Sequence, residues 1–226
     1  MNKKLLAAMV VGAAGLAWAA PQAKADPVSI GLQEGGGTIT TEITGNGAAS
    51  VSNISYGTFS INDINAVGTP PSAQPDLTST SLNVTNGAAG TLVVYVTETD
   101  VTGPLGKYNL QSGFSLTTFE SPFTSVTEAT YIDTGNAAYA LTTQLSSYDF
   151  TSTSTGINEV ATTPDITGEY SITEVFTITA SADGGGATVG GSIKTSDVPE
   201  PGSLALLGTG LFALGMIGWT RRRRNV

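Results

Sequence analysis

The sequence predicts an all-β protein: an antiparallel β-sandwich or jelly-roll-like body, with an N-terminal signal peptide and a single C-terminal transmembrane helix. Residues 26–197 consist of short β-type runs separated by Gly-, Asn- and Pro-rich turns. They are rich in Thr, whose branched side chain suits a pleated sheet, and no window shows sustained helical periodicity. We therefore divide the chain into a signal peptide (1–25), a Thr-rich extracytoplasmic β domain (26–197) and a C-terminal sorting or anchor segment (198–226).

The clearest expected strand covers residues 170–180, where apolar and polar side chains alternate and only Glu174 interrupts the apolar face. Residues 92–96 are continuously apolar, which predicts a strand covered on both sides. Further strands are expected at residues 38–43, 51–60, 77–85, 108–119, 124–132, 137–150 and 187–194. Thr-x-Thr pairs recur without a common period, which argues against a β-solenoid with a regular threonine array.

The inventory of side chains excludes several classes of function. The 226 residues include no Cys and no His, so disulfides, Cys/His zinc sites and Ser-His-Asp catalysis are excluded. Of the nine basic residues only Lys107 and Lys194 lie in residues 26–197, whereas all 18 acidic residues except Glu200 lie there. Such an acidic domain cannot displace the counterions of nucleic acids, so we expect no nucleic-acid partner.

The N-terminus has the three parts of a secretory signal peptide. Lys3 and Lys4 precede a short apolar stretch at residues 5–18, and Ala23 and Ala25 supply the small side chains that signal peptidase reads. Cleavage there makes Asp26 the first mature residue, and residues 17–19 offer a second cleavage site. The expected partners are the export translocon and signal peptidase; the alternative is an uncleaved membrane anchor.

The C-terminus places a Pro-rich motif, an apolar run at residues 204–219 and a basic cluster in that order. As a helix the 16 apolar residues span roughly 24 Å, and flanking residues with snorkelling arginines extend this toward a membrane thickness. Four arginines favour the cytoplasmic side, so both ends of the chain predict a body outside the cytoplasm. The motif is Val198, Pro199, Glu200 and Pro201, and the stop-transfer cluster is Arg221, Arg222, Arg223 and Arg224.

This arrangement resembles the PEP-CTERM sorting signal of Gram-negative bacteria, over the last 29 residues only. The resemblance implies recognition and cleavage near Pro199-Glu200-Pro201 by an exosortase, and an association with exopolysaccharide and biofilm systems. The prolines support this interpretation, because they keep the chain at the membrane face extended and accessible to an enzyme. The alternative is a plain C-terminal membrane anchor with a Pro-rich entry.

Candidate sites in the body each have two interpretations. Asp100, Asp133 and Asp165 each precede a Thr-Gly pair, which indicates Asx-turns or, alternatively, Ca²⁺ ligands in loops. Glu169 and Glu174 stand near apolar positions where burial raises a pKa, as a glycosidase would need, although edge or surface carboxylates are the ordinary explanation. The densest hydroxyl cluster, a candidate for O-glycosylation, is Thr151, Ser152, Thr153, Ser154 and Thr155.

Taken together, the sequence favours a non-enzymatic structural protein of the cell surface or extracellular matrix, associated with exopolysaccharide. It is expected to be exported, held by its C-terminal helix, processed by an exosortase-like enzyme, and then released or joined to the surface matrix. No catalytic residue and no cofactor are assigned, apart from the Ca²⁺ alternative. The second interpretation is a carbohydrate- or calcium-binding surface module, and the third is a polysaccharide-acting hydrolase.

Overall fold

The computed structural model of the chain describes residues 25–69 and 74–196. The signal peptide up to Lys24, including Ala23, and the whole C-terminal segment with its Pro-Glu-Pro motif and arginines lie outside the described residues, so these predictions stay predictions. Within the described ranges, no helix is long and apolar enough to cross a membrane.

Twelve β-strands make up the described residues, in line with the prediction of an all-β body. They are β1 (Pro27–Glu34), β2 (Thr40–Asn46), β3 (Ala48–Tyr56), β4 (Phe59–Val67), β5 (Asp76–Asn86), β6 (Gly90–Val101), β7 (Asn109–Phe119), β8 (Phe123–Asp133), β9 (Thr143–Phe150), β10 (Ser154–Thr162), β11 (Tyr170–Ala180) and β12 (Gly186–Thr195).

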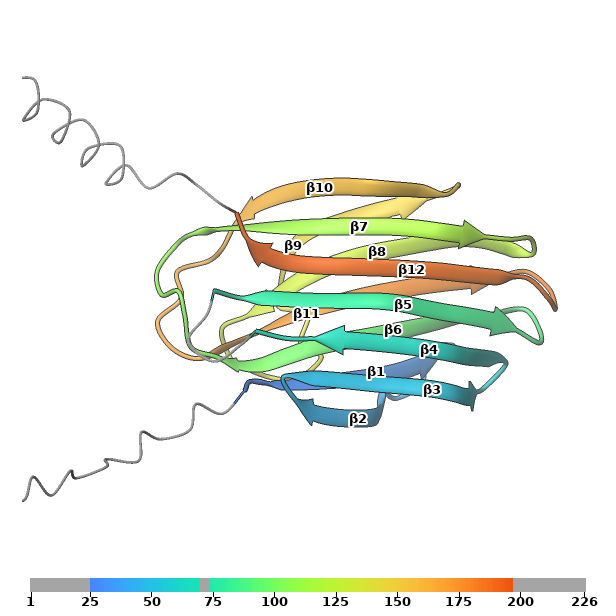
Figure 1. Cartoon of the computed structure of the whole chain (residues 1–226), viewed down its shortest axis with the longest axis horizontal. Helices are drawn as coiled ribbons and strands as arrows, with labels where there is room; N and C mark the ends of the chain where they lie inside the picture. The colour runs from blue at the N-terminus through green and yellow to red at the C-terminus, as the bar shows by residue number, and fades with distance from the viewer. Residues whose placement is uncertain (1–24, 70–73, 197–226) are drawn as a thin grey trace, which may run out of the picture.

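The strands form two six-stranded antiparallel sheets that pack face to face, which confirms the predicted β-sandwich (Figure 1). Sheet A has the order β2-β1-β6-β11-β8-β9, and sheet B has the order β10-β7-β12-β5-β4-β3. From β5 to β8 the chain alternates between the two sheets, so many neighbouring strands come from distant parts of the sequence. The face of each sheet that is turned toward the other carries the apolar core.

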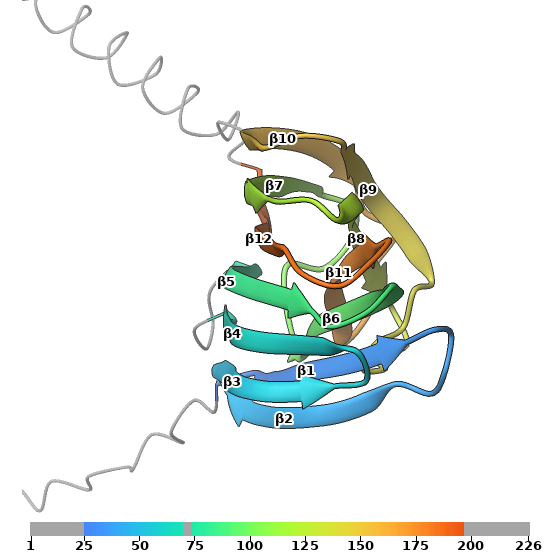
Figure 2. The same ribbon diagram turned by 90° about the vertical axis from the view of Figure 1, so that its right-hand side faces the viewer.

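The chain passes directly from one sheet to the other at both edges of the sandwich, as Figure 2 shows. At one edge Gly47, with φ of +72°, joins β2 to β3, and at the other a short turn joins β9 to β10. The edge strands of the two sheets therefore contact each other. This arrangement protects the unpaired backbone groups of the edges from pairing with other chains.

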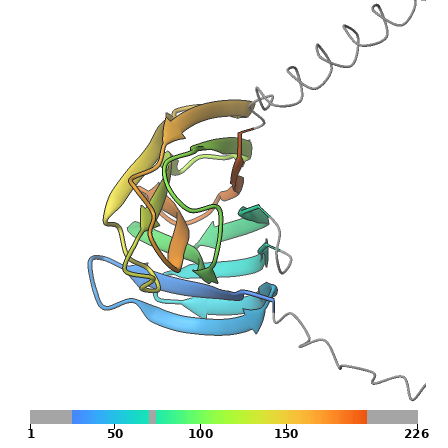
Figure 3. The same ribbon diagram turned by 90° about the vertical axis from the view of Figure 1, so that its left-hand side faces the viewer.

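The first and last strands place both ends of the described chain at the same end of the sandwich (Figures 1 and 3). β1 starts there, and β12, which runs through the middle of sheet B, finishes there. The opposite end of the sandwich is consequently remote from the two ends of the described chain.

The two strongest strand predictions are confirmed by the packing. Tyr170, Ile172, Phe176, Ile178 and Ala180 all point into the core from β11 and are at most 3% exposed. The apolar run at residues 92–96 lies in β6, a central strand whose side chains are buried on the inner face and largely buried on the outer face.

The predicted strand at residues 137–150 is wrong in its first half, because only Thr143–Phe150 forms a strand. Residues 134–142 instead fold over the outer face of sheet A. The Ser171 hydroxyl donates to the carbonyl of Ala137 (2.9 Å), the Tyr139 amide donates to the Thr97 hydroxyl (3.2 Å), and the Tyr139 ring packs edge-on against Tyr95. This cover explains why polar outward residues of β6 and β11 are buried.

The predicted strand at residues 51–60 is in fact the hairpin of β3 and β4, with its turn at Gly57 and Thr58. Gly57 has φ of +58°, and the Glu34 carboxylate accepts hydrogen bonds from the Thr58 amide (3.0 and 3.1 Å) and from its hydroxyl. A side chain at Gly57 would overlap that carboxylate. The sequence prediction also missed β1 and β10 as strands.

Candidate functional site

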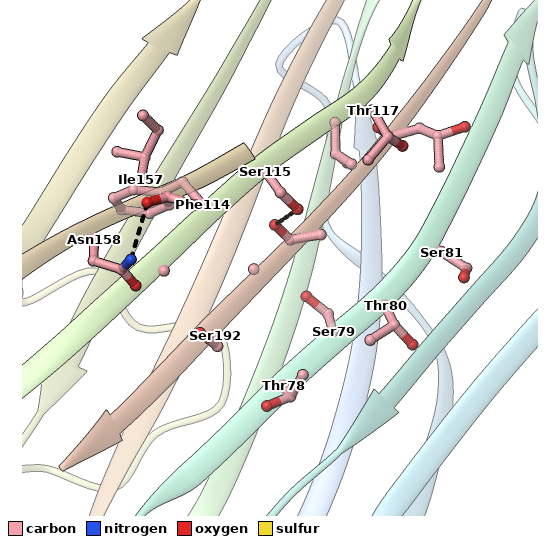
Figure 4. Close-up of a pocket in the computed structure, with 16 residues that line it drawn as sticks. Thr78, Ser79, Thr80, Ser81, Phe114, Ser115, Thr117, Ile157, Asn158 and Ser192 are labelled. Carbon is pink, nitrogen blue, oxygen red and sulfur yellow. Dashed lines mark hydrogen bonds between the residues drawn. The ribbon is translucent and has the colours of Figure 1, made fainter. Parts of the chain in front are cut away.

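A depression lies on the outer face of sheet B, across β10, β7, β12 and β5, with a volume of about 420 Å³ (Figure 4). We call it the groove. It exists because the outward positions of β7 and β12 along this stretch are Gly, Ser or Thr, whereas the inward positions carry the core. These outward residues are Gly113, Ser115 and Thr117 of β7, and Thr188, Gly190 and Ser192 of β12.

A β-bulge deepens the groove between β5 and β12. Val189 pairs with Leu82 and Gly191 pairs with Ser79, so two residues of β5 stand opposite Gly190 alone. A Cβ atom at Gly190 would lie 3.1 Å from the carbonyl oxygen of Ser79 and 3.3 Å from the hydroxyl of Ser115. Any larger residue at position 190 would therefore crowd the floor, and glycine keeps it open.

The groove presents hydroxyl, amide and peptide groups to solvent. The Ser115 hydroxyl donates to the carbonyl of Gly190 (2.9 Å) and the Asn158 side chain donates to the carbonyl of Gly156 (2.9 Å), which fixes both side chains in place (Figure 4). The hydroxyls of Thr80 and Ser192 make no side-chain hydrogen bond with the described residues. The groove can thus both donate to and accept from the hydroxyl groups of a ligand.

No charged side chain lines the groove, and its single aromatic residue, Phe114, is only 3% exposed. It therefore offers neither an ion pair nor an exposed ring for stacking. Recognition there must rest on hydrogen bonds, apolar contact and shape.

Beneath the groove floor lie two buried glutamates from sheet A. Of the two interpretations of Glu174, the structure supports burial over an edge or surface position: Glu174 is 1% exposed, and its carboxylate accepts a hydrogen bond from the Ser79 hydroxyl of sheet B. Burial raises the pKa of Glu174 to about 8, against the lowering effect of that bond. Burial and the neighbouring Glu174 raise the pKa of Glu128 to about 9.

Two of the three loops in which an Asp precedes Thr-Gly have hydrogen bonds to the Asp carboxylate. The Asp133 carboxylate accepts from the Ala137 amide (3.0 Å) and the Thr142 hydroxyl (2.7 Å), and that of Asp100 accepts from the Asn136 side chain (2.7 Å). Asp165 is exposed. No group of three or more acidic side chains suited to a metal ion occurs in the described residues. The local bond from the Ala137 amide supports the Asx-turn interpretation at Asp133, whereas the Asp100 carboxylate is held by the side chain of Asn136 in another loop.

The other predicted site residues lie apart from the groove floor. Thr151, Ser152, Thr153 and Thr155 are exposed in and next to the β9–β10 turn, as O-glycosylation would require, and Ser154 is half-buried. Glu169 is exposed beside β11 and lines no part of the groove. Ala25 is the first described residue and directly precedes Asp26 and β1.

The groove itself was not predicted, although the sequence contains a signal for it. Small residues alternate with buried ones at positions 113, 115 and 117 and again at 188, 190 and 192. Only the pairing of β7 with β12 brings the two series side by side.

Comparisons with known proteins do not assign the chain to a family. No family model matches it, and no curated protein matches it. Solved structures with limited likeness to this chain include the following two. One is the carbohydrate-binding module TmCBM61 in complex with β-1,4-galactotriose, with 15% identity, a TM-score of 0.25, and 58% of this chain and 78% of that chain covered. The other is the enzymatically active domain of bacteriophage CBA120 tailspike protein 4, with 13% identity, a TM-score of 0.25, and 63% of this chain and 18% of that chain covered. Likeness at this level carries no functional argument.

Proposed function

We propose that this protein is an exported surface or matrix protein whose groove binds a neutral glycan. The observation that carries the proposal is a groove whose lining combines hydroxyl, amide and peptide groups with the apolar residues Phe114, Ile157 and Val189, without a single charged side chain. Sugar hydroxyls are matched by such donors and acceptors. The groove crosses four strands, and three interstrand spacings give it a length of roughly 14 Å, enough for a short stretch of glycan.

The charge of the body argues for a neutral rather than an anionic glycan. Lys107 and Lys194 are the only basic residues among the 26–197 segment, which carries nearly all the acidic residues of the chain. Polymers rich in carboxylate or sulfate groups would be repelled by this surface.

Binding is favoured over hydrolysis because glycoside cleavage requires two carboxyl groups facing the scissile bond. No Asp or Glu lines the groove: Glu174 lies behind its floor and Glu169 lies elsewhere on the surface. A non-catalytic binding module fits these positions better than a hydrolase.

Export and anchoring set the place of action. The signal peptide with its Ala23 and Ala25 cleavage site, and the Pro199-Glu200-Pro201 segment with its following apolar run, support delivery of the body to the cell surface. There a glycan-binding sandwich would join the exopolysaccharide layer, by release or by attachment to the matrix.

The glycan proposal is tested with the mature chain on a panel of immobilised polysaccharides: a neutral β-galactan, β-glucan and α-mannan, the host exopolysaccharide, and the anionic alginate. We expect binding to at least one neutral polymer and none to alginate. Ser115→Ile, which removes a hydroxyl and fills the centre of the groove, should weaken binding at least tenfold. The matched control is Ser60→Ile at an exposed position of β4 outside the groove.

Both variants should retain the wild-type melting temperature, so that loss of binding is not loss of folding. Equal binding by Ser115→Ile and Ser60→Ile would mean that the groove is not the glycan-binding site. Equal binding of alginate would contradict the selection of neutral glycans.

Export and processing are tested by the intact mass of the protein from its native host, in membrane and in medium. A mass from Asp26 to near Pro201, with or without glycan increments, is the expected result. A mass that retains residues 204–226 in every fraction would mean a plain membrane anchor.

A further inference from the structure

Three glutamates lie on the inner face of sheet A, on the neighbouring strands β6, β11 and β8. Glu98, Glu174 and Glu128 are each at most 1% exposed. The register offsets them by two residues from strand to strand: Glu98 pairs with Ile172, and Glu128 pairs with Phe176. Adjacent members are therefore diagonal neighbours on one face, a spacing that long side chains can bridge.

The three carboxyl groups differ in their hydrogen bonds. Both oxygens of Glu98 accept from Thr69, through its amide and its hydroxyl. Glu174 accepts only from Ser79, at Oε2, while its Oε1 has no partner. Neither oxygen of Glu128 makes a hydrogen bond of normal geometry, although the backbone of Ser115 lies close enough to oppose the rise that burial causes in its pKa. Unpartnered buried carboxyl oxygens are costly, so these two side chains indicate a ligand rather than a purely structural role.

Glu128 and Glu174 both reach across the core to the underside of the groove floor. A Cβ atom on Gly191 would lie 3.2 Å from the carboxyl carbon of Glu174. Besides burial, the nearby carboxyl of Glu174 raises the pKa of Glu128 and the backbone of Ser115 in the adjacent strand β7 lowers it, so Glu128 lies close to both. The two carboxyl groups thus converge beneath the segment of β12 that contains Gly190 and Gly191.

The surroundings of this pair supply further oxygen atoms. Thr130 is the cross-strand partner of Glu174, and its hydroxyl shares a 2.6 Å hydrogen bond with that of Ser112 from sheet B. With Ser79, three hydroxyl groups accompany the two carboxyl groups. All of these residues are at most 1% exposed.

No basic side chain is available to compensate the pair. Lys107 and Lys194 are the basic residues of the described ranges, and both are exposed on the surface. Burial leaves both carboxyl groups largely protonated at pH 7; once a cation displaces these protons, the two carboxylates carry the charge that one divalent cation neutralises. The chain contains no Cys and no His, so an oxygen-binding cation such as Ca²⁺ is the chemical match.

We propose that Glu128 and Glu174 bind a divalent cation, with Ca²⁺ as the fitting ion, between the two sheets beneath the groove floor. Glu174 Oε1 and the two Glu128 oxygens are the ligands, and the hydroxyls of Ser112 and Thr130 lie alongside. The cation joins sheet A to the strands that form the groove. Because only two carboxylates contribute, we expect an affinity in the range of extracellular modules, about 10⁻⁴–10⁻³ M.

The first test compares thermal unfolding of the mature chain in EDTA and in excess CaCl₂. Binding at about 100 times the dissociation constant should raise the melting temperature by about 5 °C or more. Glu128→Gln and Glu174→Gln should each abolish this rise. The matched control is Glu98→Gln, a neighbouring buried carboxyl already partnered by Thr69, which should keep it.

The second test needs no variant: Mn²⁺ is titrated into the isotope-labelled wild-type protein, and paramagnetic broadening of amide resonances is mapped. Broadening centred on Ser115, Glu174 and Gly191 is expected. Absence of a Ca²⁺-dependent rise in melting temperature, a rise that survives both Gln variants, or broadening centred on the Asp100 and Asp133 turns would each overturn the proposal. Neither test involves a glycan, so its result is independent of the function of the groove.

Discussion

Glu98 provides a prediction of pH-dependent stability that can be worked out from the structure. Its side chain is fully buried on β6, where the amide and hydroxyl of Thr69 donate to its two oxygens. Burial raises the pKa of Glu98 from 4.5 to about 7; the bonds from Thr69 oppose this, and the charges of Asp26 and Asp76 add to it. The perturbation we consider is Glu98→Gln, which keeps the shape of the side chain and removes the titration.

The magnitude follows from the difference between the pKa values of the folded and unfolded states. A rise of this size corresponds to about 3 kcal/mol. The folded state binds the proton more tightly than the unfolded state does. The contribution of the protonated Glu98 is therefore fully present at pH 4.5 and below, and it is lost as the pH rises to 7.

Urea unfolding of the wild type and of Glu98→Gln, between pH 4 and 8 with EDTA, measures this contribution. The wild-type free energy of unfolding minus that of the variant should fall by about 3 kcal/mol between pH 4.5 and pH 8, with the curve flattening at the upper end of this range. Glu120→Gln, which removes an exposed carboxylate, serves as the charge control. A wild-type minus Glu98→Gln difference that stays constant across the range would refute the reasoning, because it would mean that Glu98 titrates alike in both states.

Three further substitutions test the packing of the sandwich by denaturant unfolding. The Tyr170 hydroxyl donates to the carbonyl of Gly103 (2.7 Å), so Tyr170→Phe should cost about 1–3 kcal/mol, whereas Tyr148→Phe, whose hydroxyl has no partner among the described residues, should be nearly neutral. Phe176→Ala, at a 1% exposed core position, should cost about 3–5 kcal/mol, and a cost below about 1 kcal/mol would contradict the assigned core. Gly57→Ala should destabilise the β3–β4 hairpin by at least about 1 kcal/mol, because it forces positive φ and overlaps Glu34; a neutral effect would argue against this turn.

The alternation of apolar and polar side chains within one strand could be predicted from the sequence. The hydrogen-bond partners that come from distant segments could not. The pattern of residues 170–180 placed Tyr170 and Phe176 on the buried face, where the structure has them. The same pattern made Glu174 an interruption, because its partner Ser79 lies 95 residues away on the other sheet. Glu128 was not predicted as a site residue for the same reason: the groups near it, from Ser115 and Glu174, belong to other strands.

Turn chemistry explains the errors in strand boundaries. Residues 51–60 have strand-forming side chains on both sides of Gly57, and the interaction that defines the turn comes from Glu34 on β1. The expected strand from residue 137 begins only at Thr143, because the Asp133 carboxylate accepts hydrogen bonds from Ala137 and Thr142 and holds the intervening chain in a loop. The Asp-Thr-Gly pattern predicted this turn. It did not predict that the following loop would cover the outer face of sheet A.

The consecutive glycines of β12 connect the two proposals about this molecule. A side chain at Gly190 would fill the groove from outside, against Ser79 and Ser115, whereas a side chain at Gly191 would press inward on Phe176 and Glu174. Strand β12 therefore separates the groove on its outer side from the carboxyl groups of Glu174 and Glu128 on its inner side. A cation bound by these two carboxyl groups would restrain β12 from its inner side. Less conformational entropy would then be lost when a ligand binds the groove, so the ligand should bind the cation-loaded protein more tightly. Glycan binding measured in Ca²⁺ and in EDTA should differ for the wild type and be equal for Glu174→Gln; equal affinities for the wild type would mean that the groove and the carboxyl pair act independently.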